Sequence, residues 1–208
     1  MILTHNINRS RRIAGPGIAV KRAADVIMSA AALIISPLLL IPAAIAIKIS
    51  SPGPVFFRQK RTGLMGKEFV CIKLRTMRPN DACDILQATD SDPRITRVGT
   101  WLRRTSIDEI PQFWNVLRGD MSVVGPRPHM LTHTRQYSPL IDNYMDRHLV
   151  RPGITGLAQV NGFRGPTAEL KLMQQRVECD LRYIENWSPM LDLSIIGRTI
   201  LICLGFVK

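Results

Sequence analysis

The longest apolar run in the chain lies near its N-terminus. No charged side chain occurs from Val26 to Ile47, and about 20 apolar residues are enough for a helix to cross the hydrocarbon core of a bilayer. A cleaved signal peptide is disfavoured, because the run is too long and its small-residue triplet, Ala44-Ile45-Ala46, lies inside it rather than after it. We therefore expect a membrane segment, with a buried core helix as the alternative.

Two features of this run disfavour a simple transmembrane span. Ser36-Pro37 falls near its middle, where a proline removes a helical hydrogen bond and bends the helix. Basic residues lie at both ends of the run, so both ends favour the cytoplasmic side of a membrane. The basic residues are Arg9, Arg11, Arg12, Lys21 and Arg22 before the run and Lys48, Arg58, Lys60 and Arg61 after it. A re-entrant hairpin over residues 21–50 satisfies both features, provided that the Ser36 hydroxyl bonds a backbone group freed at Pro37. A kinked span is the alternative.

Shorter patterns after the run predict a compact domain. Ser51-Pro52-Gly53-Pro54 is a breaker cluster that ends the hairpin. The apolar runs Val55–Phe57 and Phe69–Leu74 predict two short strands, and residues 81–92 are polar enough for a loop.

The segment 101–117 has apolar residues at mixed three- and four-residue spacing, namely Trp101, Leu102, Ile107, Ile110, Phe113, Trp114 and Leu117. This spacing predicts a helix that buries one face. Asp108, Glu109 and Asn115 fall on its other face, which the pattern leaves in water.

The C-terminal third predicts further helices. The pattern indicates a turn-rich loop at 121–128, an amphipathic helix at 137–149, a glycine-rich connection at 151–165 and a long polar helix at 169–185. The apolar stretch 187–206 is interrupted by Asp192 and Arg198, which favours an interfacial helix, with Tyr183 and Trp187 as anchoring aromatics, over a span. A helix that closes the soluble core is the alternative.

Composition adds a charge constraint. The 208 residues include 28 Lys and Arg against 16 Asp and Glu, a net charge of +12, which indicates an acidic partner such as nucleic acid, anionic lipid or a phosphorylated substrate. The length favours a single domain. The four cysteines lack the spacing of a zinc site or a disulfide framework, so we expect reduced thiols in a cytoplasm.

The adjacent acids Asp108 and Glu109 are the strongest candidates for chemistry. Ser106 to Glu109 matches a helix capping box, in which such acids only stabilise the helix start. Pro111 would then occupy the fifth helical position, where a proline is poorly tolerated. Carboxylates among cations also suit a metal-bound diphosphate, with one acid binding Mg²⁺ and the other acting as nucleophile or base. The nearby cations are Lys73, Arg75, Arg94, Arg97, Arg103, Arg104, Arg118 and Arg127, and solvated ion pairs are the alternative.

A series of short motifs, specific in order and spacing, extends over roughly residues 20–205. They are Ser36-Pro37, the run from Ser51 to Gly63 (SPGPVFFRQKRTG), KLRTM from Lys73, DPRIT from Asp92, SIDEIPQ from Ser106, NVLRGDMS from Asn115, GPRP from Gly125 and RPGITG from Arg151. In these motifs the chain resembles the small monotopic phosphoglycosyl transferases, also called bacterial sugar transferases, which prime exopolysaccharide and O-antigen synthesis.

The resemblance implies an α+β fold class: a mainly helical, monotopic membrane protein with an N-terminal re-entrant membrane helix-break-helix and small strands. Residues 1–20 would form a basic N-terminal segment, 21–50 the re-entrant hairpin, and 51–208 the catalytic domain with its C-terminal interfacial helix. Ser36 and Pro37 match the pair that breaks the membrane helix.

The resemblance also implies a reaction. Asp108 matches the family nucleophile, which attacks the β-phosphate of a UDP-sugar, forms a phosphosugar-aspartate and releases UMP before the sugar phosphate passes to undecaprenyl phosphate. Glu109 matches the Mg²⁺ ligand. The expected substrate-binding residues are Arg127, Pro126, Pro128, Lys73, Arg75 and Arg103, with Arg127 at the nucleotide and the other cations near the phosphates or the acid pair.

The expected partners are a UDP-sugar, undecaprenyl phosphate and lipid of a bacterial inner membrane, at its cytoplasmic face. A nucleic-acid-binding protein would account for the charge, but the chain has no recognisable reading helix or interleaved stacking aromatics, and the apolar run would stay unexplained. A membrane-anchored scaffold is the second alternative; it predicts that Asp108 is replaceable. The motifs do not separate galactose from glucose, and a homo-oligomer stays open.

Overall fold

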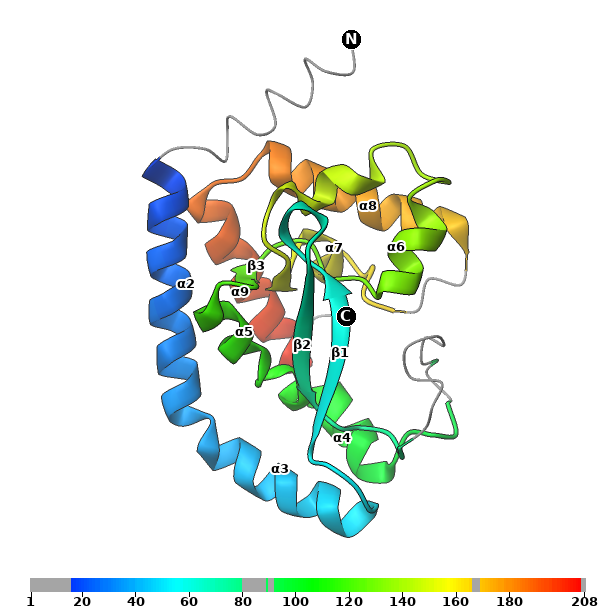
Figure 1. Cartoon of the computed structure of the whole chain (residues 1–208). Coiled ribbons are helices and arrows are strands. Elements are labelled where there is room, and N and C mark those ends of the chain that lie inside the picture. The colour runs from blue at the N-terminus through cyan, green and yellow to red at the C-terminus, as the bar shows by residue number, and fades with distance from the viewer. Residues whose placement is uncertain (1–15, 80–88, 90–91, 166–168, 207–208) are drawn as a thin grey trace.

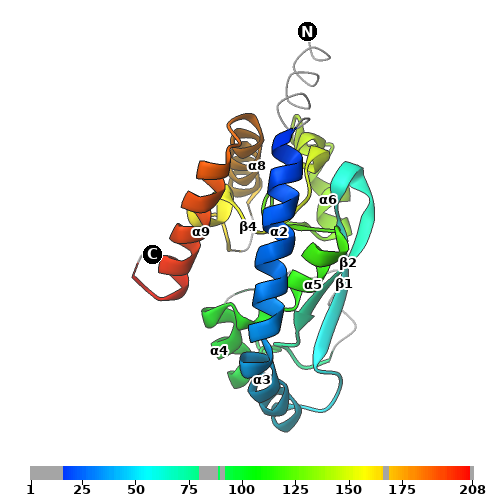
Figure 2. The ribbon, with the colours of Figure 1, turned by 90° about the vertical axis from the view of Figure 1, so that its left-hand side faces the viewer.

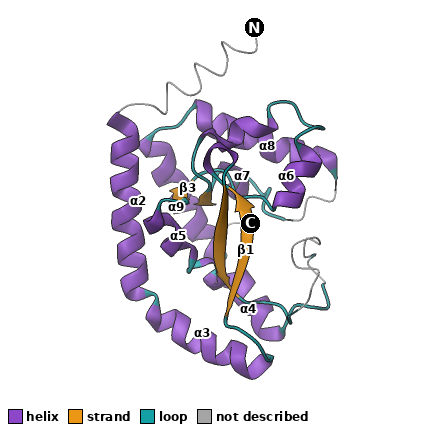
Figure 3. Ribbon diagram, in the orientation of Figure 1, coloured by secondary structure: helices purple, strands orange, loops and turns teal. Residues whose placement is uncertain are grey.

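The computed structural model describes residues 16–79, 89, 92–165 and 169–206. Its elements, in chain order, are α2 (Pro16–Ile35), α3 (Pro37–Ser50), β1 (Phe56–Thr62), η1 (Leu64–Gly66), β2 (Glu68–Leu74), α4 (Arg97–Thr105), η2 (Ile107–Glu109), α5 (Gln112–Arg118), β3 (Ser122–Val124), α6 (Leu131–Tyr137), η3 (Tyr144–Leu149), β4 (Gly153–Thr155), α7 (Leu157–Val160), α8 (Leu170–Glu185) and α9 (Pro189–Cys203). Helices predominate, with two small strand pairs among them (Figure 3), so the α+β prediction is confirmed. Most of the predicted loop 81–92 and part of the segment 1–20 lie outside the described residues.

The predicted break in the apolar run separates α2 from α3, which are bent by 57° and frame one side and the base of the molecule in Figure 1. Pro37 has no N–H to donate to the carbonyl of Leu33, four residues earlier. The Ser36 hydroxyl donates to that carbonyl instead, at 2.9 Å, as expected. No single helix in the described ranges is both long and apolar enough to cross a bilayer, whereas the bent pair together reaches that length and composition.

The helix α2 runs along one side of the domain (Figure 2), and polar side chains fasten its N-terminal half there. Lys21 Nζ donates to the Val124 carbonyl at 3.0 Å and pairs with Asp192 at 2.6 Å. The guanidinium of Arg22 donates to two carbonyls of α5. Asp25, only 3% exposed, accepts from the backbone N–H of Val123 at 2.9 Å. Lys21, Arg22 and Asp25 therefore have their partners in β3, α5 and α9.

The second arm of the hairpin contacts the same domain through apolar side chains. Ala43 and Ile47 of α3 are buried against Leu74 of β2 and Leu102 of α4. The opposite faces of both helices stay apolar and exposed, as at Ile34, Leu38, Ile41, Ile45 and Ile49. Both arms therefore rest on one domain and present apolar side chains outward.

The two predicted strands form the antiparallel hairpin β1–β2, with Phe56 opposite Leu74 and Thr62 opposite Glu68. A second, parallel pair joins β3 to β4, with Ser122 opposite Gly153. A side chain at Gly153 would collide with the backbone of Gly125, so glycine permits this close pairing.

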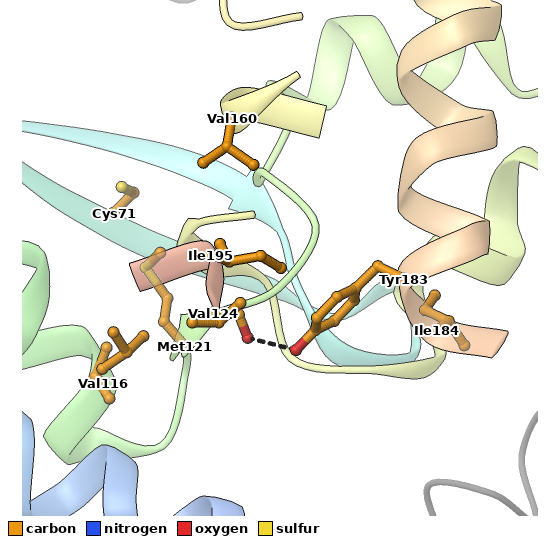
Figure 4. Close-up of a cluster of buried hydrophobic side chains, with 9 residues drawn as sticks. Cys71, Val116, Met121, Val124, Val160, Tyr183, Ile184 and Ile195 are labelled. Carbon is orange, nitrogen blue, oxygen red and sulfur yellow. Dashed lines mark hydrogen bonds between the residues drawn. The ribbon is translucent and has the colours of Figure 1, made fainter. Parts of the chain in front are cut away.

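The main core lies between β3, α5, α8 and α9 (Figure 4). It gathers Cys71, Val116, Met121, Val123, Val124, Val160, Tyr183, Ile184 and Ile195. The Tyr183 hydroxyl donates to the Val124 carbonyl at 3.2 Å. Tyr183 is only 2% exposed, so its interpretation as an interfacial anchor is wrong.

The predicted helix at 169–185 is confirmed as α8. The stretch 187–206 forms α9, which buries Ile195 in the core and exposes Met190, Leu193 and Ile200 on its other side. This helix closes the core with one face and leaves a second apolar face uncovered.

Two helix predictions are wrong. The 101–117 segment is not one helix but α4, η2 and α5, interrupted at Ser106, whose φ of 58° is left-handed, and at Pro111. The 137–149 segment is also broken, because α6 ends at Tyr137 and the chain resumes as η3 after Asn143, whose φ of 59° is also left-handed. Apolar spacing alone does not detect such breaks.

Candidate active site

The break at Ser106 turns the acid pair into the domain. Ser106 ends α4, and its side chain makes no capping bond to η2, so the capping-box interpretation is wrong. Asp108 and Glu109 lie in the single turn η2 and are only 7% and 6% exposed. The expectation that these acids face water is therefore also wrong.

Glu109 is held by cations from separate segments. Its Oε1 accepts from Lys73 Nζ of β2 at 2.7 Å and from Arg127 Nη2, beyond β3, at 2.8 Å. Arg164 Nη2 lies 3.9 Å from Oε2 and donates to the Ser106 hydroxyl at 2.9 Å. Burial alone would raise the pKa of Glu109, but Arg127 and Lys73 hold it well below its ordinary value. Glu109 is therefore an anion at neutral pH.

Asp108 has a different environment. Its Oδ1 is buried and has no hydrogen-bond partner among the described residues. Burial, reinforced by the charge of Glu109, raises the pKa of Asp108 to about 6, although Lys73, Arg103 and Arg127 act in the opposite direction. Two adjacent carboxyls with pKa values moved apart are typical of sites where each acid has its own role.

The surrounding framework holds the cations in place. Asn115 of α5 donates to the Val70 carbonyl at 2.7 Å and accepts from Ile72 N at 3.1 Å, so α5 fixes the strand that carries Lys73. Arg103 Nε donates to Thr76 Oγ1 at 2.9 Å. Asn115 therefore supports the strand beside the acid pair as a buried residue, and its predicted place on a solvated face is wrong.

Other predicted site residues lie around this cluster. Arg75 donates from its guanidinium to the carbonyls of Ser51 and Pro52, at the end of the hairpin. Pro126 and Pro128 flank Arg127 and contribute backbone carbonyls, to Gly153 N and to Arg61 respectively. Ser36 and Pro37 stay at the helix break. The structure thus gathers Lys73, Arg103, Asp108, Glu109 and Arg127, and places Arg75 at the hairpin instead.

Arg164 is a site residue that the sequence analysis did not identify. It follows Gly162 in the glycine-rich connection and belongs to none of the motifs quoted for the resemblance. A cavity of about 100 Å³ opens beside Glu109 and Arg164, between η2, α5, β4, α7 and α9. Space for part of a ligand therefore adjoins Glu109.

Of the two Glu109 oxygens, Oε2 has the longer contacts with cations and could hold a divalent metal. Oε1 already accepts from Lys73 and Arg127, whereas the closest cationic nitrogens to Oε2 are 3.5 and 3.9 Å away. Magnesium is usually held by one or two carboxylates together with substrate phosphates and water. In the described part of the chain no group of three His, Cys, Asp or Glu side chains could hold a metal, which leaves few protein ligands for such an ion.

The chain matches a family model and several curated proteins. The sequence model of the Bacterial sugar transferase family matches residues 17–205. The UDP-glucose:undecaprenyl-phosphate glucose-1-phosphate transferase of Xanthomonas campestris pv. campestris is 56% identical over 169 residues, which cover 80% of this chain and 35% of that protein. The protein of the same description from Caulobacter vibrioides is 52% identical, over 86% of this chain and 68% of its own length.

A third relative has a similar length to this chain. The exopolysaccharide production protein PSS of Rhizobium leguminosarum bv. phaseoli is 45% identical, over 88% of this chain and 94% of its own. The chain spans less than half the length of several other curated relatives that it matches. Since the family model extends over nearly all of the sequence, the chain belongs to the bacterial sugar transferase family.

Proposed function

We propose that this protein transfers a hexose 1-phosphate from a UDP-sugar to undecaprenyl phosphate, releases UMP, and primes exopolysaccharide or O-antigen synthesis. The names of the relatives favour glucose over galactose as the hexose. One observation carries the proposal: Asp108 has a buried carboxyl oxygen without a hydrogen-bond partner among the described residues, beside a second acid that is neutralised by cations.

In the first step, a carboxylate oxygen of Asp108 attacks the β-phosphorus of the UDP-sugar. The bond between that phosphorus and the bridging oxygen breaks, and UMP leaves with the electron pair. An anionic nucleophile reaches an anionic diphosphate only where positive charge offsets the repulsion, and Lys73, Arg103 and Arg127 supply such charge next to Asp108.

In the second step, a phosphate oxygen of undecaprenyl phosphate attacks the same phosphorus, and Asp108 leaves as a carboxylate. The donor and the acceptor then never need to occupy the site together, so the kinetics are expected to be ping-pong.

Magnesium, held by Glu109 and the phosphates, would supply Lewis-acid stabilisation of the charge that develops on the diphosphate. The residues of the chain contribute the rest. Lys73 and Arg127 orient Glu109 through short bonds to its Oε1, and Oε2 has a longer contact of 3.5 Å with Arg127 Nη1.

The central test is release of UMP before any lipid is added. Purified protein is incubated with Mg²⁺ and UDP-glucose carrying a labelled β-phosphate. We expect about one UMP per active site in a burst, with the label on a peptide that contains Asp108. Release of UMP only after undecaprenyl phosphate is added would refute the covalent route and favour direct attack by the lipid phosphate.

The burst should depend on pH through Asp108. The attacking form is the carboxylate, and its pKa is raised to about 6, so the rate constant of the burst at low donor concentration should fall about tenfold per pH unit below pH 6 and level off above it. The measurement omits lipid, because a phosphate monoester itself titrates near pH 6. A constant rate from pH 5 to pH 8 would contradict the assignment of Asp108.

We also propose that α2 and α3 form a re-entrant hairpin at the cytoplasmic face of a bacterial inner membrane. A bitopic span would place the start of α2 across the bilayer from the domain, roughly 30 Å away. Lys21 instead bonds Val124 and Asp192 of that domain, while Ile47 of the other arm packs on it as well. These contacts support entry and exit on one side, with exposed apolar faces of the hairpin and α9 toward lipid.

Cysteine labelling tests this topology. Val20, which is 59% exposed, and Lys60, whose side chain is 69% exposed, precede and follow the hairpin. We expect Val20→Cys and Lys60→Cys to react with an impermeant maleimide only from the cytoplasmic side, with the unmodified protein giving the background of its native cysteines. Periplasmic labelling of Val20→Cys alone would establish a transmembrane span.

A further inference from the structure

A buried ion pair lies behind the active-site segment that carries Arg127. Arg147 of η3 donates through Nε and Nη2 to Asp180 Oδ2 of α8, at 3.0 and 2.6 Å. Both side chains are only 1% exposed. Burying two charges requires their desolvation, and apolar residues of similar volume often stabilise a fold equally well. Stability alone therefore gives little reason for an ion pair at this place.

The remaining donors of Arg147 are directed at the segment around Pro128. Nη2 also donates to the carbonyl of Arg127 at 2.8 Å, and Nη1 donates to His129 Nδ1. A guanidinium cannot accept a hydrogen bond, so His129 Nδ1 is the acceptor and the ring proton resides on Nε2. One guanidinium thus bonds both residues that flank Pro128.

The same short segment is fixed by further bonds. The Tyr144 hydroxyl lies 2.7 Å from His129 Nδ1, and Arg61 donates to the Pro128 carbonyl at 3.0 Å. Burial and the charge of Arg147 lower the pKa of His129 well below its ordinary value, so the ring stays neutral and remains an acceptor at physiological pH. The chain from Arg127 to His129 is therefore held at three consecutive residues.

We propose that Arg147 and Asp180 are positioning residues, which set the Arg127 side chain against Glu109 and toward the donor diphosphate. Asp180 orients the guanidinium of Arg147, Arg147 fixes the Arg127 carbonyl, and the Arg127 side chain then meets Glu109 Oε1 at 2.8 Å. Displacing a charged group by about 1 Å is enough to weaken catalysis strongly. The contact with the donor rests on the proposed function, whereas the effect on the Arg127–Glu109 pair does not.

The chemistry of the network predicts which substitutions preserve it. Lysine keeps the positive charge at position 147 but cannot bond Asp180, Arg127 and His129 through a planar fork. The double substitution Arg147→Met with Asp180→Leu removes both buried charges together, so it avoids an unpaired ion and should remain folded. Both Arg147→Lys and the Met/Leu pair should loosen Arg127, because each removes the guanidinium that bonds the Arg127 carbonyl and His129.

The kinetic test uses the lipid-free burst of UMP from UDP-glucose. We expect Arg147→Lys and the Met/Leu pair each to raise the donor concentration at half-maximal burst rate, here called the donor KM, about tenfold or more, without a matching loss of burst amplitude. Arg127→Ala should raise the KM at least as much, and adding Arg147→Lys to it should change nothing further, because residues that act through one another are not additive. Arg151→Lys is the matched control, since Arg151 donates to the Gly119 carbonyl at 2.9 Å, away from the acid pair; its KM should stay within twofold.

A substrate-free measurement separates this inference from the proposed function. If Arg147 acts on the Arg127–Glu109 pair, Glu109→Gln combined with Arg147→Lys should melt no lower than the more damaging single variant. Two results would show that the network is only a structural support. The first is a double variant Arg127→Ala/Arg147→Lys whose increase in KM is the product of the two single increases. The second is a double variant Glu109→Gln/Arg147→Lys whose loss in melting temperature is the sum of the two single losses. A wild-type protein that releases no UMP would refute the proposed function instead, and the melting measurement would still decide the role of Arg147.

Discussion

Replacing Asp108 by asparagine is expected to abolish the covalent adduct and to reduce turnover by at least about 10⁴-fold, the scale seen when a covalent nucleophile is removed. Asparagine preserves the shape of the side chain but has no carboxylate to attack phosphorus. The measurement combines label transfer to the Asp108 peptide with UMP release. Asp142→Asn is the control, because Asp142 is an exposed acid, and it should retain full activity.

The stability of Asp108→Asn provides an internal check. Burial raises the pKa of Asp108 from its ordinary value of 3.8 to about 6. Ionisation of this carboxyl therefore opposes folding increasingly as the pH rises from 3.8 to about 6. A neutral asparagine should therefore raise stability at pH 7.5 by on the order of 2 kcal/mol, and by about half as much at pH 5. Lower melting at pH 7.5 would mean that lost activity reflects damage to the fold. Transfer near the wild-type rate would exclude Asp108 as the nucleophile.

Replacing Glu109 by glutamine should reduce both stability and rate. The Glu109 side chain is 8% exposed and pairs with Lys73 and Arg127. Removing one partner of a buried ion pair destabilises a protein by about 3–5 kcal/mol. For a chain of this length that corresponds to a melting temperature lower by roughly 10 °C. Adduct formation should slow as well, because the proposed magnesium ligand is lost.

The same variant should change the pH profile in a defined direction. The charge of Glu109 helps to raise the pKa of Asp108, while Lys73 and Arg127 lower it. Without Glu109, the cations act on Asp108 unopposed, so the pH at half-maximal burst rate should move below its wild-type position. A shift to higher pH would indicate that the two carboxyls are not coupled as the structure implies. Glu185→Gln, a substitution in the last turn of α8, serves as the control.

The sequence predicted most elements that local chemistry determines. Three such signals act within a few positions of the chain. Pro37 predicts the helix break, the breaker cluster after Ser50 predicts the turn, and the alternating residues of β2 predict a strand, and the structure has all three. The Ser36 hydroxyl bond to Leu33 was predictable for the same reason, since a lost helical donor requires a nearby replacement.

The orientation of the acid pair could not be obtained from periodicity. Helical spacing assigned Trp101 and Trp114 to the interior and Asp108 and Glu109 to water, yet the tryptophans are 55% and 51% exposed and the acids are buried. The left-handed turn at Ser106 reverses the direction in which the next side chains point. Burial of Glu109 becomes favourable only through cations from other segments, which no local pattern contains.

The contact between Lys21 and Asp192 also has a consequence for biosynthesis. These residues are 171 positions apart, and at about 5–20 residues per second a ribosome needs roughly 10–30 s to make the intervening chain. During that interval the hairpin has been synthesised, while Lys21, Arg22 and Asp25 have yet to meet all of their partners on the domain. In the proposed membrane topology, the nascent helix therefore depends on water or lipid headgroups to solvate these charges, which would hold its first turns at the membrane surface until α9 emerges.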